Sequence, residues 1–314
     1  LKLKRLSEST FTPLHFMPAS LGDVVLPFLR TDFDGKGAIE RTRFINAVKT
    51  MDTGLDVERA VEVFEKAIEE SRAQVGDSIM YIRFLSWTCS PHLATATCED
   101  KARSFIKSIN VSRYGVLGTA MDLSRNMVTY ADEPNSDIAF VDPAGLPYIQ
   151  KLGPSNAGGA AGVIYRFLGI IDDVAFPEAV RSSINAPLMA KFHAYGDKRC
   201  VHVVGPNFQT WERGDESTLR QAIFEIGIAY LGVLKEFASS GLKSLRMLPI
   251  SGGIFSGPFS DEISTMTVEA LKIGFCMLAA HEQEHISKGD IRLEMCIFME
   301  KELKDFEDAF QKSS

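Results

Sequence analysis

Two glycine-rich turns are the parts of this sequence best suited to holding a ligand. The first glycine turn, Asn156 to Gly162, leads into an apolar helical stretch, and the second, Ser251 to Gly257, follows an expected strand. Glycines at such places let backbone N–H groups approach an anion closely, and a helix dipole adds to the attraction. Neither turn has a Walker Gly-Lys-Ser/Thr or the GxGxxG spacing of dinucleotide-binding folds. Together they predict a diphosphate site, although each alone also fits a tight connection.

A second candidate motif is His281-Glu282-Gln283-Glu284-His285, which has the HExxH spacing of a zinc-protease helix. On a helix the two imidazoles lie one turn apart on one face, and Glu282 would be the general base. However, the motif stands in the last turns of an expected helix, and no histidine follows it. We expect a solvated, polar helix end and assign no metal-binding residue.

The elements that would position these residues alternate between strands and helices from Cys98 onward, which predicts an α/β domain. We expect helices at Ser217 to Ser240, with Ser217 as the cap, at Ser260 to Ile286 and from Lys301. The expected strands are Arg113 to Ala120, Asn126 to Tyr130, Asp137 to Asp142, Cys200 to Val204, Ser244 to Ile250 and Ile291 to Met299. Residues 172–197 form an expected insertion that could cover the cleft.

Four segments of this half, in order, resemble the macrodomain family of ADP-ribose-binding modules. Ile138 to Gly145 is similar to the family's Ala-Ile-Val-Asn-Ala-Ala-Asn segment, and Gly159 to Gly169 to its Gly-Val-Asp-Gly-Ala-Ile-His-Arg stretch. Val201 to Pro206 resembles its His-Thr-Val-Gly-Pro strand, and Pro249 to Phe255 resembles its phosphate loop. The resemblance spans roughly residues 100–312. It implies an α/β fold of three layers, α/β/α, around a mixed sheet.

The resemblance also implies which residues bind ADP-ribose or a related ADP-ribosyl nucleotide. Backbone amides of both turns would hold the diphosphate, Phe255 would pack beside the distal ribose, and Asp132 is the nearest match to the adenine-binding Asp. Asn156 is a candidate substitute for a missing polar side chain. The expected ligand-binding residues are Asp132, Asn156, Gly158, Gly159, Ala160, Gly162, Val163, Ser251, Gly252, Gly253, Ile254 and Phe255.

Three positions depart from the hydrolytic members of that family. The Asn that orients the distal ribose falls at Gly145, the acid of the helical stretch at Ala161, and the usual His at Tyr165. A hydrogen atom or a methyl group cannot position water or take a proton. We therefore expect binding without efficient hydrolysis and no cofactor. An ADP-ribosyl hydrolase with atypical residues and a protein-interaction scaffold with a disused cleft are the alternatives, so whether the chain is an enzyme stays open.

The first hundred residues have a helical character of their own. Asp32 to Arg43 resembles an EF-hand loop, with acids at its first and third places, Gly at the sixth and Ile39 at the eighth. Its fifth and twelfth places are the cations Lys36 and Arg43, where calcium requires oxygen ligands. The loop therefore fits the EF-hand fold and does not fit calcium binding.

A second loop at Arg72 to Arg83 would place Ile79 at its own eighth position, although its ligand positions are almost all lost. We expect a degenerate EF-hand-like pair that is structural or binds a protein partner, with an unrelated helical domain as the alternative. The expected organisation is an N-terminal extension at 1–19, an all-α EF-hand-like domain at 20–97 and a macrodomain-like domain at 98–314.

The composition limits the class of protein and its surroundings. The 314 residues are 45% hydrophobic and 24% charged, and the net charge of −7 disfavours non-specific nucleic-acid binding. No apolar run reaches the roughly 18–20 residues of a membrane span. The five cysteines form no CxxC pair, which indicates reduced thiols and an intracellular protein, cytoplasmic or nuclear. The expected partner is ADP-ribose or an ADP-ribosylated protein, with no nucleic acid and no membrane.

Overall fold

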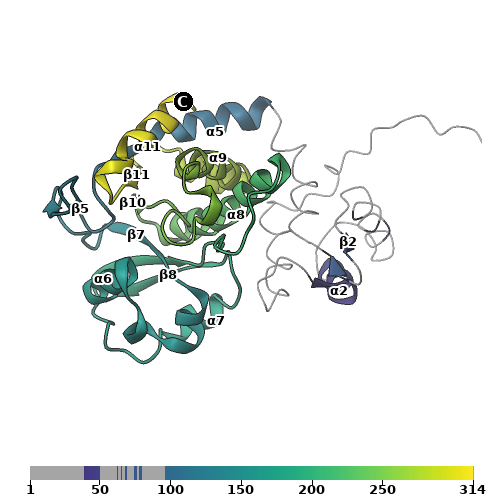
Figure 1. The fold of residues 1–314 in the computed structure, drawn as a ribbon, viewed down its shortest axis with the longest axis horizontal. Helices are drawn as coiled ribbons and strands as arrows, with labels where there is room; N and C mark the ends of the chain where they lie inside the picture. The colour runs from purple at the N-terminus through teal and green to yellow at the C-terminus, as the bar shows by residue number, and fades with distance from the viewer. Residues whose placement is uncertain are drawn as a thin grey trace, which may run out of the picture.

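A six-stranded sheet organises the chain (Figure 1). The computed structural model describes residues 39–49, 62, 65, 68, 74–75, 78–79 and 96–313. Strand order is β4-β11-β10-β7-β9-β8, in which β8 is antiparallel to β9 and the other neighbours are parallel. The strands are β4 (Ile109–Ser112), β7 (Ile138–Pro143), β8 (Ala190–Tyr195), β9 (Lys198–Val203), β10 (Ser244–Met247) and β11 (Arg292–Cys296).

Helices cover both faces of this sheet, so the expected three-layer α/β/α arrangement is confirmed. Successive residues of a strand point to opposite faces. Val141 and Met247 therefore pack with Tyr230 on one face, whereas His202 faces the other and contacts the ring of Phe176. The helices are α5 (Ala96–Ser108), α6 (Gly159–Leu168), α7 (Glu178–Ser183), α8 (Glu216–Ser240), α9 (Ile263–Cys276), α10 (Ala280–Ile286) and α11 (Glu300–Lys312).

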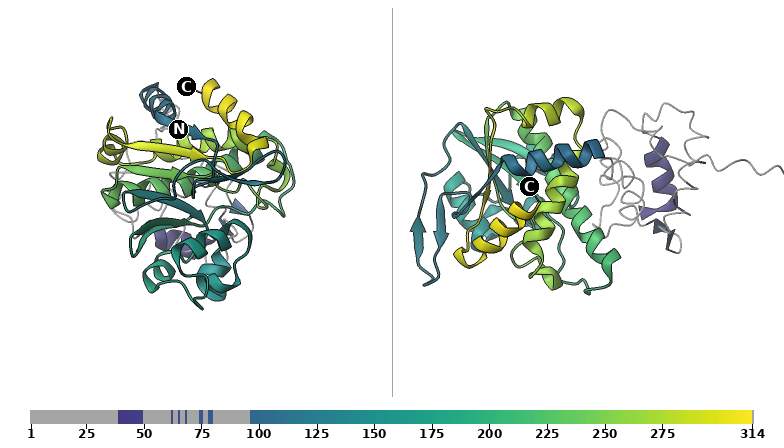
Figure 2. Two further views of the ribbon diagram at one scale, coloured as in Figure 1. Left: turned by 90° about the vertical axis from the view of Figure 1, so that its left-hand side faces the viewer. Right: turned by 90° about the horizontal axis from the view of Figure 1, so that it is seen from above.

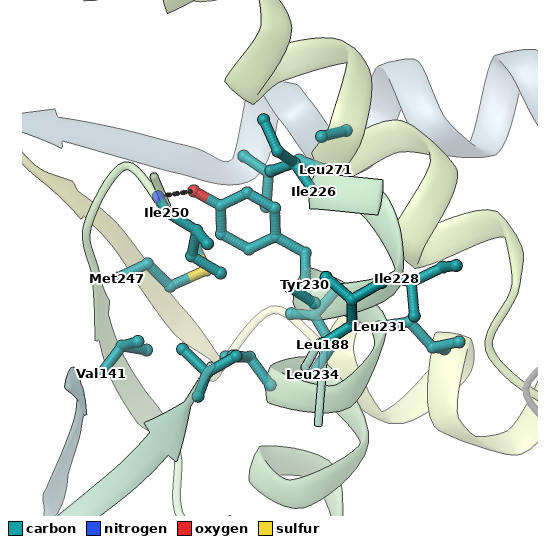
Figure 3. Close-up of a cluster of buried hydrophobic side chains, with 14 of the residues drawn as sticks. Val141, Leu188, Ile226, Ile228, Tyr230, Leu231, Leu234, Met247, Ile250 and Leu271 are labelled. Carbon is teal, nitrogen blue, oxygen red and sulfur yellow. Dashed lines mark hydrogen bonds between the residues drawn. The ribbon is translucent and has the colours of Figure 1, made fainter. Parts of the chain in front are cut away.

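The core between the sheet and α8 follows from the spacing of apolar residues along this helix. Four fully buried side chains recur three or four residues apart, those of Ile226, Tyr230, Val233 and Phe237. This spacing places them on one stripe, which must be buried against a partner. All four belong to the buried core, and Figure 3 shows Ile226 and Tyr230 among side chains of the strands and of α9.

Several expected elements have other boundaries in the structure. The single helix expected at Ser260 to Ile286 is wrong, because the chain turns between α9 and α10 and the side-chain amide of Gln283 donates to carbonyls at the end of α9. The expected cap Ser217 lies inside α8, and Asp215 accepts the hydrogen bond from the Thr218 amide instead. Local propensity predicts neither the break between α9 and α10 nor the capping residue of α8, because both depend on contacts with neighbouring segments.

The strand expected at Arg113 to Ala120 is also wrong. The sheet strand β4 lies earlier, and the chain turns before β5 (Thr119–Met121), which pairs with β6 (Met127–Thr129) in a separate hairpin. This hairpin stands out at one side of the domain (Figure 2). The insertion expected at 172–197 supplies α7 and the edge strand β8, so it extends the sheet.

Two cysteines expected to be reduced are joined in the structure. Cys98, in the first turn of α5, and Cys276, the last residue of α9, form a disulfide. Cys200 and Cys296 are free and buried, and Cys89 lies outside the described residues. The premise of wholly reduced thiols is therefore wrong for this pair, whose spacing of 178 residues no local pattern could reveal. The intracellular location stays a prediction.

The covalent link generates a stability prediction. A cross-link between distant residues restricts the unfolded chain, so reduction of the wild type should lower its free energy of unfolding by about 2–4 kcal/mol. The measurement is urea unfolding with and without a phosphine reductant. The Cys98→Ala/Cys276→Ala variant is the control and should not respond to the reductant. A wild type that responds no more than this variant would contradict the disulfide.

Short segments of the N-terminal region are described as well. They are β1 (Ile39–Glu40), α2 (Arg41–Lys49), β2 (Gln74–Val75) and β3 (Ser78–Ile79). Ile39 pairs directly with Ile79 in antiparallel register, and these are the two residues expected at the eighth places of the EF-hand-like loops. The other places of those loops lie largely outside the described residues. The EF-hand-like pair and the domain boundaries stay predictions.

No helix in the described part of the chain is long and apolar enough to span a membrane.

Candidate ligand-binding site

The first glycine turn lies at the carboxyl edge of the parallel strands, because α6 runs back along β7. Near the end of α6, the Phe167 carbonyl accepts a hydrogen bond from Lys198 at the start of β9. The Phe167 ring also packs on Phe140, with centroids 5.6 Å apart. The end of α6 is thus near the amino edge of the sheet, and its beginning lies past the carboxyl end of β7.

The beginning of α6 carries backbone amides that form no hydrogen bond within the helix. Gly158 is extended and no side chain among the described residues caps the helix, and the amides of its first turn lack an intrahelical acceptor. A Cβ at Gly158 or Gly159 would meet no atom within 4 Å. In contrast, a Cβ at Gly162 would lie 2.9 Å from the carbonyl oxygen of Ala157. Gly162 is therefore needed for packing, while the two earlier glycines leave room in front of the amides.

The second glycine turn offers a similar set of amides after β10, the neighbour of β7. The amides of Gly253, Ile254 and Phe255 donate no hydrogen bond to any residue that the structure describes. A Cβ at Gly253 would meet nothing within 4 Å, and the side chain of Ile254 is 78% exposed. Ser251 holds the turn in a left-handed conformation with φ 59°, which is uncommon for a residue with a side chain.

The loop after β9 holds the second glycine turn in place. The Ser251 hydroxyl donates to the carbonyl of Pro206 at 2.6 Å. A Cβ at Gly205 would lie 2.6 Å from Ile250 Cγ2, so only glycine allows these loops to approach this closely. Because β9 and β10 flank β7, their loops meet beyond its carboxyl end. Gly205 and Pro206 are not among the residues that the sequence predicts for the site, because a Gly-Pro pair after apolar residues indicates only the end of a strand.

The remaining residues expected at the site differ in exposure and in hydrogen bonding. Asn156 is exposed, and its amide nitrogen donates to the carbonyl of Leu152, so it fastens the turn before α6. Ala160 and Val163 are exposed on the first turn of α6. Phe255 is half-buried. Val163 directly follows the first glycine turn and the others lie on the two turns, and contact of any of them with a ligand stays a prediction.

Asp132 lies apart from both turns, on the segment that returns from the β5–β6 hairpin. Its side chain is exposed, and its carbonyl accepts a hydrogen bond from Arg246 Nη1 at 2.9 Å. Arg246, on β10, is 6% exposed and also donates to the Val116 carbonyl and to Glu294, the last at 3.2 Å. This buried guanidinium ties the hairpin to the sheet and thereby places Asp132, a link that the sequence did not reveal.

The arginine contacts predict a large effect of mutation. Arg246→Met leaves two carbonyls without this donor and removes the cation that pairs with Glu294, which keeps the Tyr114 hydroxyl as a donor, and the free energy of unfolding should fall by roughly 2 kcal/mol or more. Urea unfolding measures this change. Lys272→Met is the control, because it breaks the more exposed Lys272–Glu269 pair and should cost less than about 1 kcal/mol. Equal losses in the two variants would contradict the anchoring role.

A buried polar chain lies beneath the end of β7. Asp142 and His202 are fully buried, with Oδ2 and Nδ1 2.7 Å apart. The other ring nitrogen of His202 lies 2.8 Å from the Tyr195 hydroxyl. With Nδ1 donating to the carboxylate, Nε2 accepts from the tyrosine, so one neutral tautomer satisfies both contacts. These hydrogen bonds link β7 and β9 near their carboxyl ends to Tyr195 of β8.

Tyr165 occupies the position where the resemblance places a histidine, and it is 0% exposed. Burial, and then the Asp142 carboxylate, raise the pKa of this phenol well above its usual range. It therefore stays protonated at neutral pH and is shielded from a bound ligand. Gly145 and Ala161 supply no polar side chain either, so none of the three positions offers a general base.

The zinc-type motif serves a structural purpose in α10. Glu282 is 8% exposed, and its carboxylate accepts a hydrogen bond from the Ala279 amide at 2.9 Å, which caps the helix. Because this carboxylate is buried and bonded to the helix N-terminus, it is not available as a general base. Among the described residues no group of three or more His, Cys, Asp or Glu could hold a metal ion.

The chain is similar to solved structures whose sequence identity to it is low. No protein-family model matches the chain, and no curated protein matches it either. An Oceanobacillus iheyensis macrodomain with ADP aligns at a TM-score of 0.39 and 17% identity, over 56% of this chain and 84% of that one. A Trypanosoma brucei macrodomain in complex with ADP-ribose aligns at 0.35 and 15% identity, over 70% and 94%. Alphavirus P23pro-zbd aligns at 0.37 and 17% identity, over 56% and 22%.

Proposed function

We propose that this protein binds ADP-ribose or a related ADP-ribosyl nucleotide through its two glycine turns. The observation that carries the proposal is the placement of both turns beyond the carboxyl ends of adjacent parallel strands, β7 and β10. Within the described part of the chain, each turn presents amides without an acceptor and glycines at which a Cβ would meet no atom within 4 Å. Ligands of open α/β sheets bind at this edge, outside the ends of the strands.

A diphosphate is the chemical group that suits two such turns. Its oxygens accept hydrogen bonds from backbone amides, and the N-terminal end of α6 adds a favourable partial charge. Backbone donors do not depend on the net charge of the chain, so the value of −7 is compatible with an anionic ligand. The sequence resemblance supplies the remainder of the ligand, with Phe255 beside the distal ribose and Asp132 toward the adenine.

We further infer that binding is not followed by efficient hydrolysis. Gly145 and Ala161 cannot position water, and the hydroxyl of Tyr165 is buried with its pKa raised. A protein modified with mono-ADP-ribose should therefore stay modified when it is incubated with this chain. Release of ADP-ribose, followed by chromatography, at a rate that scales with the amount of this chain would overturn this inference and support the hydrolase alternative.

The binding proposal is tested by Gly253→Glu. The glutamate side chain has room, since a Cβ at this position meets nothing within 4 Å. Its carboxylate would repel the diphosphate, so ADP-ribose affinity should fall at least about a hundredfold. Isothermal titration calorimetry measures the affinity of both proteins.

A matched control separates this repulsion from a general effect of the added charge. Gly289 is also exposed, and a Cβ there likewise meets nothing within 4 Å. Gly289→Glu should bind ADP-ribose as the wild type does. Unchanged affinity in Gly253→Glu would show that the second glycine turn is not the diphosphate site, and a wild type without heat or thermal shift at millimolar ligand would refute ADP-ribose binding itself.

A further inference from the structure

The segment that enters the second glycine turn is held by one buried hydroxyl group from α8. The Tyr230 hydroxyl donates to the carbonyl of Leu248 at 2.9 Å and accepts a hydrogen bond from the amide of Ile250 at 3.1 Å. Figure 3 shows the second of these bonds, with the tyrosine ring directed from α8 toward the strand end. Both partners are backbone groups, and both lie just before Ser251.

We propose that Tyr230 is a positioning residue for the ligand site, because it sets the backbone from which the second glycine turn starts. The proposal rests on the function proposed above. Tyr230 touches no ligand itself and acts through the conformation of the loop.

The surroundings of this hydroxyl make its position specific. Tyr230 is 0% exposed, and its neighbours in the cluster include Ile226, Met247 and Leu271. A hydroxyl placed among such side chains loses water, so burying it is favourable only where it finds partners. Here the only backbone partners that the structure gives it belong to the entry of the turn. A phenylalanine would fill the same space without reaching them.

The same two bonds fix the direction of the next residues. After Ile250 the chain turns through Ser251, whose left-handed backbone is uncommon for a residue with a side chain. The Ser251 hydroxyl holds the turn from the other side, through Pro206. With Tyr230 on one side and Pro206 on the other, the amides of Gly253 to Phe255 are preorganised for an anion. Preorganisation of this kind lowers the cost of binding.

The test is the Tyr230→Phe variant, measured by calorimetry with ADP-ribose. Loss of the two hydrogen bonds should weaken affinity roughly three- to tenfold, while the variant stays folded. Phe237→Leu is the control for a general loss of core packing, because Phe237 is equally buried two turns further along α8. This control should lower the unfolding midpoint and leave the affinity for ADP-ribose unchanged.

Hydrogen exchange measured by NMR gives a readout that does not need a ligand. In the ligand-free wild type the amide of Ile250 should exchange slowly and those of Gly253 and Ile254 rapidly, and in Tyr230→Phe the Ile250 amide should exchange rapidly as well. Fast exchange of Ile250 in the wild type overturns the proposal, even if the variant fails to fold. So does an unchanged affinity in a folded Tyr230→Phe. A wild type that does not bind ADP-ribose refutes the proposed function instead, and the exchange experiment then still decides whether Tyr230 holds the turn.

Discussion

The close contact between the loops after β9 and β10 is the constraint on which the site depends. Gly205 lies so near Ile250 and Ser251 that any side chain there would clash, and the Ser251 hydroxyl completes the contact through Pro206. These two strands flank β7, so their joined loops bound the edge at which α6 begins. This contact and the hydrogen bonds of Tyr230 hold the second glycine turn from two sides. A set of free amides binds an anion well only when their geometry is fixed beforehand.

The two faces of the sheet contribute differently to that edge. The face toward α8 is largely apolar, and the Tyr230 hydroxyl on it holds the entry of a turn. The opposite face carries polar groups in low-dielectric surroundings, namely the Asp142–His202 pair and Arg246. Asp142 and His202 bond to each other between β7 and β9, and Arg246 bonds to the hairpin segment. Polar groups buried in this way are costly unless paired, so they favour one arrangement of the connecting loops.

Much of the fold could be predicted from local patterns. The alternation of strands and helices, the long helix α8 and the two glycine turns all follow from residue type and spacing, and the three-layer arrangement is confirmed. The errors fall where two distant segments meet. The break between α9 and α10 depends on Gln283 and Glu282, and the disulfide joins Cys98 to Cys276. Neither the break nor the disulfide can be predicted from the residues of a single helix.

The sequence by itself determined which atoms could hold a ligand, because glycines expose backbone amides whatever the fold, and because Gly145 and Ala161 carry no group for catalysis. Only the tertiary structure decided where those amides lie. It brought the two turns, far apart along the chain, to one edge through parallel pairing of β7 and β10. It also committed Glu282 to a helix cap and buried Tyr165. Parallel pairing, burial and capping depend on partners distant in sequence, and local residue patterns do not specify them.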